Sequence, residues 1–197
     1  MKALNICIDI DGTLTRSDDW LDLINQAFNK SFTLENQKVY EYHRLVDITR
    51  EEYDTFYQKH KKEMFAKSSF RPKAKEVLAQ LHQNHRVHFV TARDQEVEPV
   101  TIQWLLENFV DYDSISHLGS HHKVQRAFEL RCDLFIEDRY ENALELSKAG
   151  FEVLLMNCPY NQGPLHHRTT RVCHWTDILQ WVQEKELQGT PLLAKAL

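Results

Sequence analysis

"ICIDIDGTLT", residues 6–15, is the stretch from which we infer the fold of this chain. It begins as an apolar run of the kind that forms a buried strand. It ends in two aspartates one residue apart, Asp9 and Asp11, which are followed by Gly12. Carboxylates this close raise each other's pKa unless a cation compensates their charge. The stretch therefore predicts a strand whose carboxyl end carries a functional site.

Strand-like and helical patterns alternate through most of the chain. The expected strands are residues 4–10, 87–92, 114–118, 132–138 and 152–157, with a short edge strand at 171–175. The expected helices are residues 71–85, 96–109, 122–131, 141–150 and 176–187. Near-continuous apolar strands separated by helices are typical of a parallel sheet covered on both faces. The sequence therefore predicts an α/β fold with a doubly wound parallel sheet.

Residues 16–70 interrupt this alternation. They read as three helices at 19–30, 34–46 and 50–66, without a strand-like run. An insertion directly after the first strand would lie above the carboxyl ends of the strands, where open α/β sheets bind ligands. We therefore expect a core domain of residues 1–15 and 71–188, a small all-helical cap of residues 16–70, and a loosely held tail of residues 189–197.

Composition and charge exclude several classes of protein. The net charge of the 197 residues is −5, and no segment concentrates lysine and arginine, so a nucleic-acid polymer is not an expected partner. No apolar run approaches the roughly 18 residues of a membrane span. The four cysteines are far apart and no signal-peptide pattern is present, so we expect a cytoplasmic protein with reduced thiols. The sequence indicates no oligomeric state.

Other strand ends carry chemically useful side chains. Glu137 and Asp138 close an apolar run, as the first aspartate pair does. Two acidic pairs at one sheet edge suit Mg²⁺ beside a phosphate, although single pairs also serve as helix caps or surface acids. Thr91 ends the second strand and Lys123 begins a helix after the third. A hydroxyl and an ammonium could hold a phosphoryl group, although each alone is also common as a cap or a solvated residue.

In this order the motifs resemble the haloacid dehalogenase (HAD) superfamily of Mg²⁺-dependent phosphohydrolases. The resemblance rests on the run from Asp9 to Thr15, on Thr91, on Lys123 and on the Glu137–Asp138 pair. It implies that Asp9 is a nucleophile that forms an aspartyl-phosphate, and that Asp11 acts first as general acid and then as base. Thr91 and Lys123 would hold the phosphoryl group, and Gly12 and Thr13 would lie beside it.

The resemblance also implies a Mg²⁺ site. The carboxylates of Asp9 and Asp138 and the backbone carbonyl of Asp11 would hold the ion. Either acid of the second pair could be the direct ligand; we favour Asp138, with Glu137 acting through water.

Within the superfamily, the chain is most similar to the 5′(3′)-deoxyribonucleotidase-like group. The similarity lies in "VTAR" (90–93), "LFIEDR" (134–139) and "NCPYNQG" (157–163). It implies a nucleoside monophosphate as the phosphate monoester substrate. Arg93 and Arg139 would flank the site and steer this anion, with Arg93 binding it, although both could also be ordinary surface arginines. Trp20 would stack on the base, with Tyr40, Tyr42 and Tyr160 as other candidates for stacking.

Two other functions remain open from the sequence. The same chemistry could serve another small phosphorylated metabolite, such as a sugar phosphate. A phosphate-binding regulatory domain without turnover is the third candidate, although both acids of the first pair are present. The adjacent histidines at 121–122 and 166–167 are expected to be solvated loop residues, because neighbouring histidines do not easily face one zinc ion.

Overall fold

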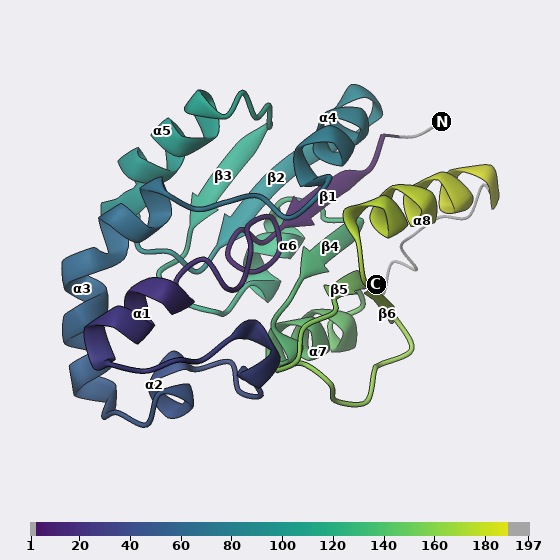
Figure 1. Cartoon of the computed structure of the whole chain (residues 1–197). Coiled ribbons are helices and arrows are strands. Elements are labelled where there is room, and N and C mark those ends of the chain that lie inside the picture. Colours follow the sequence, from purple (N-terminus) through teal and green to yellow (C-terminus); the bar gives the residue numbers. More distant parts are fainter. Residues whose placement is uncertain (1–2, 189–197) are drawn as a thin grey trace.

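A six-stranded parallel sheet forms the centre of the protein in a computed structural model, which describes residues 3–188. Its strands are β1 (Asn5–Ile8), β2 (Arg86–Thr91), β3 (Ser114–His117), β4 (Leu134–Glu137), β5 (Glu152–Met156) and β6 (Thr169–Val172). The strand order is β3-β2-β1-β4-β5-β6, and all neighbouring pairs are parallel (Figure 1). This confirms the predicted α/β fold with a doubly wound sheet.

The edge strand β6 begins and ends earlier than predicted. Its pairing with β5 stops at Val172, whereas the sequence predicted a strand at residues 171–175. The backbone N–H groups of Cys173 and His174 both donate to the carboxylate of Asp177, each at 2.9 Å. These donors are thus used at the start of the following helix and are not available to the sheet.

Helices cover both faces of the sheet, because successive strand residues point to opposite sides. Ile6 and Ile8 pack in one apolar cluster with α4 (Ala74–Asn84), α5 (Glu98–Glu107) and α8 (Trp175–Gln188). Cys7 packs in a second cluster with α6 (Val124–Glu129) and α7 (Tyr140–Lys148). The core is therefore built from three layers. Within residues 3–188, no helix has the length and apolar character needed to cross a membrane.

Residues 16–70 form a separate apolar cluster of their own. Their elements are α1 (Leu21–Phe28), the 3₁₀ turn η1 (Leu34–Asn36), α2 (Tyr42–Leu45) and α3 (Arg50–Ala66). Leu21 and Ile24 of α1 pack against Phe56 and Met64 of α3. Figure 1 shows α1, α2 and α3 together, beyond the end of the sheet where β1 stops. This places the segment over the carboxyl ends of the strands.

The helix predicted over residues 34–46 is wrong. The structure has only the turn η1 and the short helix α2 there, with irregular backbone over residues 37–41. The N–H of Lys38 turns back to the carbonyl of Asn36 at 2.8 Å, which ends the helical pattern after one turn. The irregular residues include side chains that line the cavity described below.

Two paired segments connect residues 16–70 to the sheet. Thr15 and Phe70 form an isolated antiparallel bridge. Beside it, the N–H of Arg16 donates to the carbonyl of Ser69 (2.9 Å), and that of Arg71 donates to the carbonyl of Leu14 (3.0 Å). The segment that leaves the sheet (residues 14–16) and the segment that returns to it (residues 69–71) therefore lie side by side next to the end of β1.

Candidate active site

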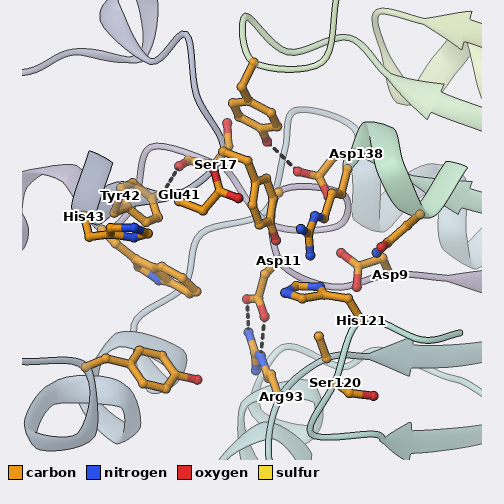
Figure 2. A pocket seen from close by; sticks show the side chains of 18 of the residues that line it. Asp9, Asp11, Ser17, Glu41, Tyr42, His43, Arg93, Ser120, His121 and Asp138 are labelled. Atoms are coloured by element: carbon orange, nitrogen blue, oxygen red, sulfur yellow. Dashed lines mark hydrogen bonds and ion pairs between the residues drawn. The ribbon is translucent and has the colours of Figure 1, made fainter. Parts of the chain in front are cut away.

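Three carboxylates meet at the carboxyl ends of β1 and β4. Asp9 follows β1, and Glu137 and Asp138 lie at the end of β4. The two strands are neighbours, with Ile8 opposite Ile136, and so their ends reach the same edge of the sheet. One oxygen from each of the three carboxylates lies within 4.8 Å of the others, and all three residues are buried. Figure 2 shows Asp9 and Asp138 facing the same space.

Lys123 brings a positive charge into this cluster. It stands at the start of α6, and its Nζ donates to Asp9 and to Oε1 of Glu137, the latter at 3.1 Å. Burial lowers the pKa of the Lys123 amine, but the two carboxylates outweigh this effect and raise the pKa above its ordinary value. Lys123 is therefore a buried ammonium, and it links the chain after β3 to the ends of β1 and β4.

The cluster carries more negative than positive charge. Three carboxylates face one ammonium, so two negative charges are uncompensated when all three acids are ionised. Burial, opposed by Lys123, raises the pKa of Asp9 to about 7. Burial and the neighbouring charge of Asp9 raise the pKa of Asp138 to about 7. Hard oxygen donors and an excess of two negative charges fit a divalent cation of the Mg²⁺ type.

A shell of hydrogen bonds holds the second acidic pair. Asp138 accepts from the hydroxyl of Tyr160 and from Oγ1 of Thr13, the latter at 3.2 Å. Glu137 accepts from Nδ2 of Asn142 as well as from Lys123. The hydroxyl of Thr13, predicted to lie beside substrate, thus faces a carboxylate. Asn142 was not predicted; the only signal was its place five residues after Glu137.

Gly12 lies against Asp138 in a backbone conformation that favours glycine. Its φ is +82°, and a Cβ atom built there would overlap the carboxylate of Asp138 and lie 3.1 Å from the hydroxyl oxygen of Tyr160. The carbonyl of Gly12 accepts from Nε of Arg71 at 2.7 Å. Only glycine allows the loop after β1 to approach the end of β4 this closely. The contact from Arg71 was not predicted from the sequence.

Asp11 points to a different partner from Asp9. Its two carboxylate oxygens accept from Nε and Nη2 of Arg93, at 2.9 and 2.6 Å (Figure 2). Arg93 was predicted to contact the substrate, yet its side chain is buried and held by this pair. Thr91, predicted to hold the phosphoryl group, is buried at the end of β2, where its Oγ1 accepts from the N–H of Arg93 at 3.1 Å. Thr91 does not line the cavity within the described part of the chain.

A cavity of about 410 Å³ opens over these residues. Asp9, Asp11, Lys123 and Asp138 line its sheet side. The segment 16–70 supplies most of its aromatic lining, namely Trp20, Tyr40, Tyr42, Tyr53, Tyr57 and Phe65. Its volume lies in the range of pockets for small-molecule ligands. The predicted stacking candidates Trp20, Tyr40, Tyr42 and Tyr160 all line the cavity.

His121 also lines the cavity, against the expectation of a solvated loop residue. Its ring lies edge-on to Tyr40, with 5.8 Å between centroids. Burial, followed by the charges of Arg139 and Lys123, lowers the pKa of His121 to about 4, so that the imidazole is neutral near pH 7. The sequence signal for this placement was the position of His121 two residues before Lys123. A loop that places Lys123 in the site also places His121 near it.

Solved structures with this fold come from haloacid dehalogenase-like proteins. A hydrolase of that family from Streptococcus pneumoniae superposes with a TM-score of 0.68 at 15% identity, covering 92% of this chain and 99% of its own. YfnB from Bacillus subtilis, solved bound to magnesium, superposes with a TM-score of 0.60 at 13% identity, with the same coverage of both chains. The fold is that of the HAD superfamily of hydrolases.

Sequence comparison identifies the family within this superfamily. The family described as 5′ nucleotidase, deoxy (pyrimidine), cytosolic type C protein matches residues 2–187. A nucleotidase from Clostridium acetobutylicum is 44% identical over 178 residues, which cover 90% of this chain and 93% of that protein. The chain therefore belongs to this 5′-nucleotidase family and is a phosphoric monoester hydrolase.

Proposed function

We propose that this protein hydrolyses nucleoside monophosphates, with Mg²⁺ bound at the acidic cluster and Asp9 as the nucleophile. The observation that carries the proposal is the convergence of Asp9, Asp138 and Lys123 at one end of an aromatic cavity. The acids suit a cation, the ammonium suits a phosphoryl group, and the aromatic rings suit a base. This combination accounts for both ends of a nucleotide.

The metal would be held mainly by the first and last of the three acids. In this proposal the carboxylates of Asp9 and Asp138 and the backbone carbonyl of Asp11 hold Mg²⁺. Glu137 is occupied by Lys123 and Asn142, which supports an indirect role through water. When bound, Mg²⁺ supplies positive charge that offsets the phosphate oxygens and the carboxylates. The magnesium present in YfnB supports this choice of ion.

The chemistry would run in two displacements at phosphorus. A carboxylate oxygen of Asp9 attacks the phosphorus, and the bond from phosphorus to the nucleoside oxygen breaks. Asp11 donates a proton to that leaving oxygen, so that the nucleoside departs as an alcohol. Water then attacks the phosphorylated Asp9 while Asp11 takes its proton, and inorganic phosphate leaves. Lys123 would neutralise the phosphoryl oxygens throughout.

Residues 16–70 would act as the cap that selects the substrate. Their rings make up most of the aromatic wall of the cavity, and Trp20 packs against Phe65 and Tyr42 at centroid distances of 5.4 and 6.1 Å. Aromatic faces favour a nucleobase, whereas a sugar phosphate would call for a lining of hydroxyls and amides. The family description makes pyrimidine deoxynucleotides the first substrates to test.

A panel of phosphate esters tests the proposal. Purified protein is incubated with ribo- and deoxyribonucleoside 5′- and 3′-monophosphates and with sugar phosphates, each with Mg²⁺ or with EDTA. We expect phosphate release from nucleotides that requires Mg²⁺ and falls at least about 10³-fold in Asp9→Asn. Acid-quenched protein should carry labelled phosphate on Asp9 during turnover.

Three results would contradict the proposal: full activity in EDTA, retained activity in Asp9→Asn, or a preference for sugar phosphates over every nucleotide. The matched control is Asp111→Asn, because Asp111 is an exposed acid away from the cavity. This variant should keep wild-type turnover.

A further inference from the structure

Arg93 makes contacts that differ from those of a substrate-binding arginine. Its side chain is only 1% exposed, although the cavity runs beside it. Nε and Nη2 donate to the two oxygens of Asp11, and Nη1 donates to Oγ1 of Thr101 at 3.1 Å. All three guanidinium nitrogens therefore have partners inside the protein, and the flat fork of arginine matches the carboxylate at two points.

Two further contacts place Arg93 between the cap and the phosphoryl site. The centre of the guanidinium lies 3.9 Å from the ring centroid of Phe65, which belongs to α3. The backbone N–H of Arg93 donates to the hydroxyl of Thr91. Its planar face is thus covered by an aromatic ring, which leaves the guanidinium almost fully buried, whereas the Asp11 side chain is 23% exposed and faces the cavity. The geometry leaves Asp11 one well-defined orientation.

We infer that Arg93 is a positioning residue, which sets the orientation of Asp11 and does not bind the substrate phosphate. The proton that Asp11 gives to the leaving group is carried on a carboxyl lone pair that the two N–H groups of Arg93 leave free. This inference rests on the proposed function, because it takes Asp11 as the general acid. It changes the role predicted from the sequence, in which Arg93 met the anionic substrate directly. The pair with Asp11 and the burial of the side chain carry the inference.

Phosphate binding and orientation of the general acid predict different effects of an Arg93 substitution on the hydrolysis of esters with different leaving groups. Phenyl phosphate and p-nitrophenyl phosphate have almost the same shape, but p-nitrophenolate is a much weaker base and leaves without a proton. A residue that binds phosphate affects both esters equally. A residue that orients a general acid affects phenyl phosphate more, because only that leaving group needs the proton.

The experiment compares kcat/KM for both esters in wild type, Arg93→Gln and Arg93→Lys, with Mg²⁺ present. We expect the loss of kcat/KM in Arg93→Gln to be about tenfold larger for phenyl phosphate than for p-nitrophenyl phosphate. A factor of about ten is part of the roughly 10²–10⁴-fold by which a general acid accelerates a reaction. Most of the loss should appear in kcat. Inhibition by inorganic phosphate should stay within about twofold of wild type, because the phosphate site is intact. Arg93→Lys keeps the charge but not the fork, and it should show the same selective loss to a smaller degree.

Arg139→Gln is the matched control. Arg139 lines the same cavity, with its guanidinium centre 4.7 Å from the ring centroid of Tyr40, and it donates to Glu141. It should lower kcat/KM for both esters by one common factor.

An equal loss of kcat/KM on both esters in the Arg93 variants overturns the inference. Weakened inhibition by inorganic phosphate then assigns Arg93 to phosphate binding, and unchanged inhibition assigns it a purely structural role. Thermal unfolding of each variant shows whether it is folded. Failure of the proposed function is a separate result, seen as absence of turnover by wild type or as retained activity in Asp9→Asn.

Discussion

Gly12 shows how one residue type allows two acidic motifs to share a site. The positive φ of the loop after β1 and the contact with the Asp138 carboxylate both require a residue without a side chain. The Gly12 carbonyl is held by Arg71, so the loop is fixed from both sides. At the scale of single residues, the site therefore depends on the missing Cβ atom of Gly12 as well as on the charged groups of the acids.

Gly12→Ala tests this requirement. The added methyl meets the Asp138 carboxylate, and alanine at this φ costs about 1–2 kcal/mol, so Asp138 and the loop must separate. We expect at least about 10²-fold lower turnover of a nucleotide and a lower melting temperature. Gly150→Ala is the control, since Gly150 also has a positive φ, of +102°, but a Cβ there meets no atom within 4 Å. It should lower the melting temperature and leave turnover unchanged; equal turnover in both variants would contradict the steric argument.

At the scale of elements, the parallel strands and the helical segment contribute different kinds of side chain to the site. The ends of β1 and β4 and the start of α6 supply the charged groups. Helix α3 and the irregular residues 37–41 supply rings and polar groups on the opposite wall. Lys61 of α3 is paired with Glu96 of the core at 2.8 Å, which fixes that wall against the sheet layer.

Trp20→Leu tests the proposed separation of binding from chemistry. Stacking of a base on an aromatic ring contributes about 1–3 kcal/mol, so KM for thymidine 5′-monophosphate should rise about tenfold while kcat changes little. Glycerol 2-phosphate, which has no ring, should keep its KM. Phe28→Leu removes a ring from the far end of α1, outside the cavity, and should leave both constants unchanged. A parallel rise of KM for both esters in Trp20→Leu would show that the ring does not contact the base.

At the scale of the whole molecule, the buried acids of the site lower the stability of the folded protein near neutral pH. The raised pKa values of Asp9 and Asp138, about 7 each, mean that ionising either group costs the folded state free energy relative to the unfolded chain. A carboxyl whose folded pKa is raised favours folding at low pH, and this contribution is lost as pH rises from its unfolded value toward 7. Metal-free protein should therefore be strained near neutral pH.

Asp138→Asn relieves that strain and removes a proposed metal ligand. In EDTA the variant should melt above wild type, and the difference should grow between about pH 4 and about pH 7. With Mg²⁺ at about 100 times its dissociation constant, wild type should gain about 2.7 kcal/mol, or about 5–10 °C, and the variant should gain almost nothing. Differential scanning fluorimetry measures both effects. A variant that melts below wild type in EDTA, or a full Mg²⁺ shift without Asp138, would contradict this account.

The alternation of strands and helices and the acidic strand ends could be predicted from the sequence, because both are patterns among residues that are close together along the chain. The individual ion pairs, in contrast, are visible only in the folded protein. Lys123 lies 114 residues from Asp9, and Arg93 lies 82 residues from Asp11, so no local pattern encodes either pair. The half-buried position of His121 and the irregular backbone at residues 37–41 have the same origin, since both depend on the segments that pack around them. Periodicity is a property of neighbours along the chain, whereas charge pairing and burial are properties of neighbours in space.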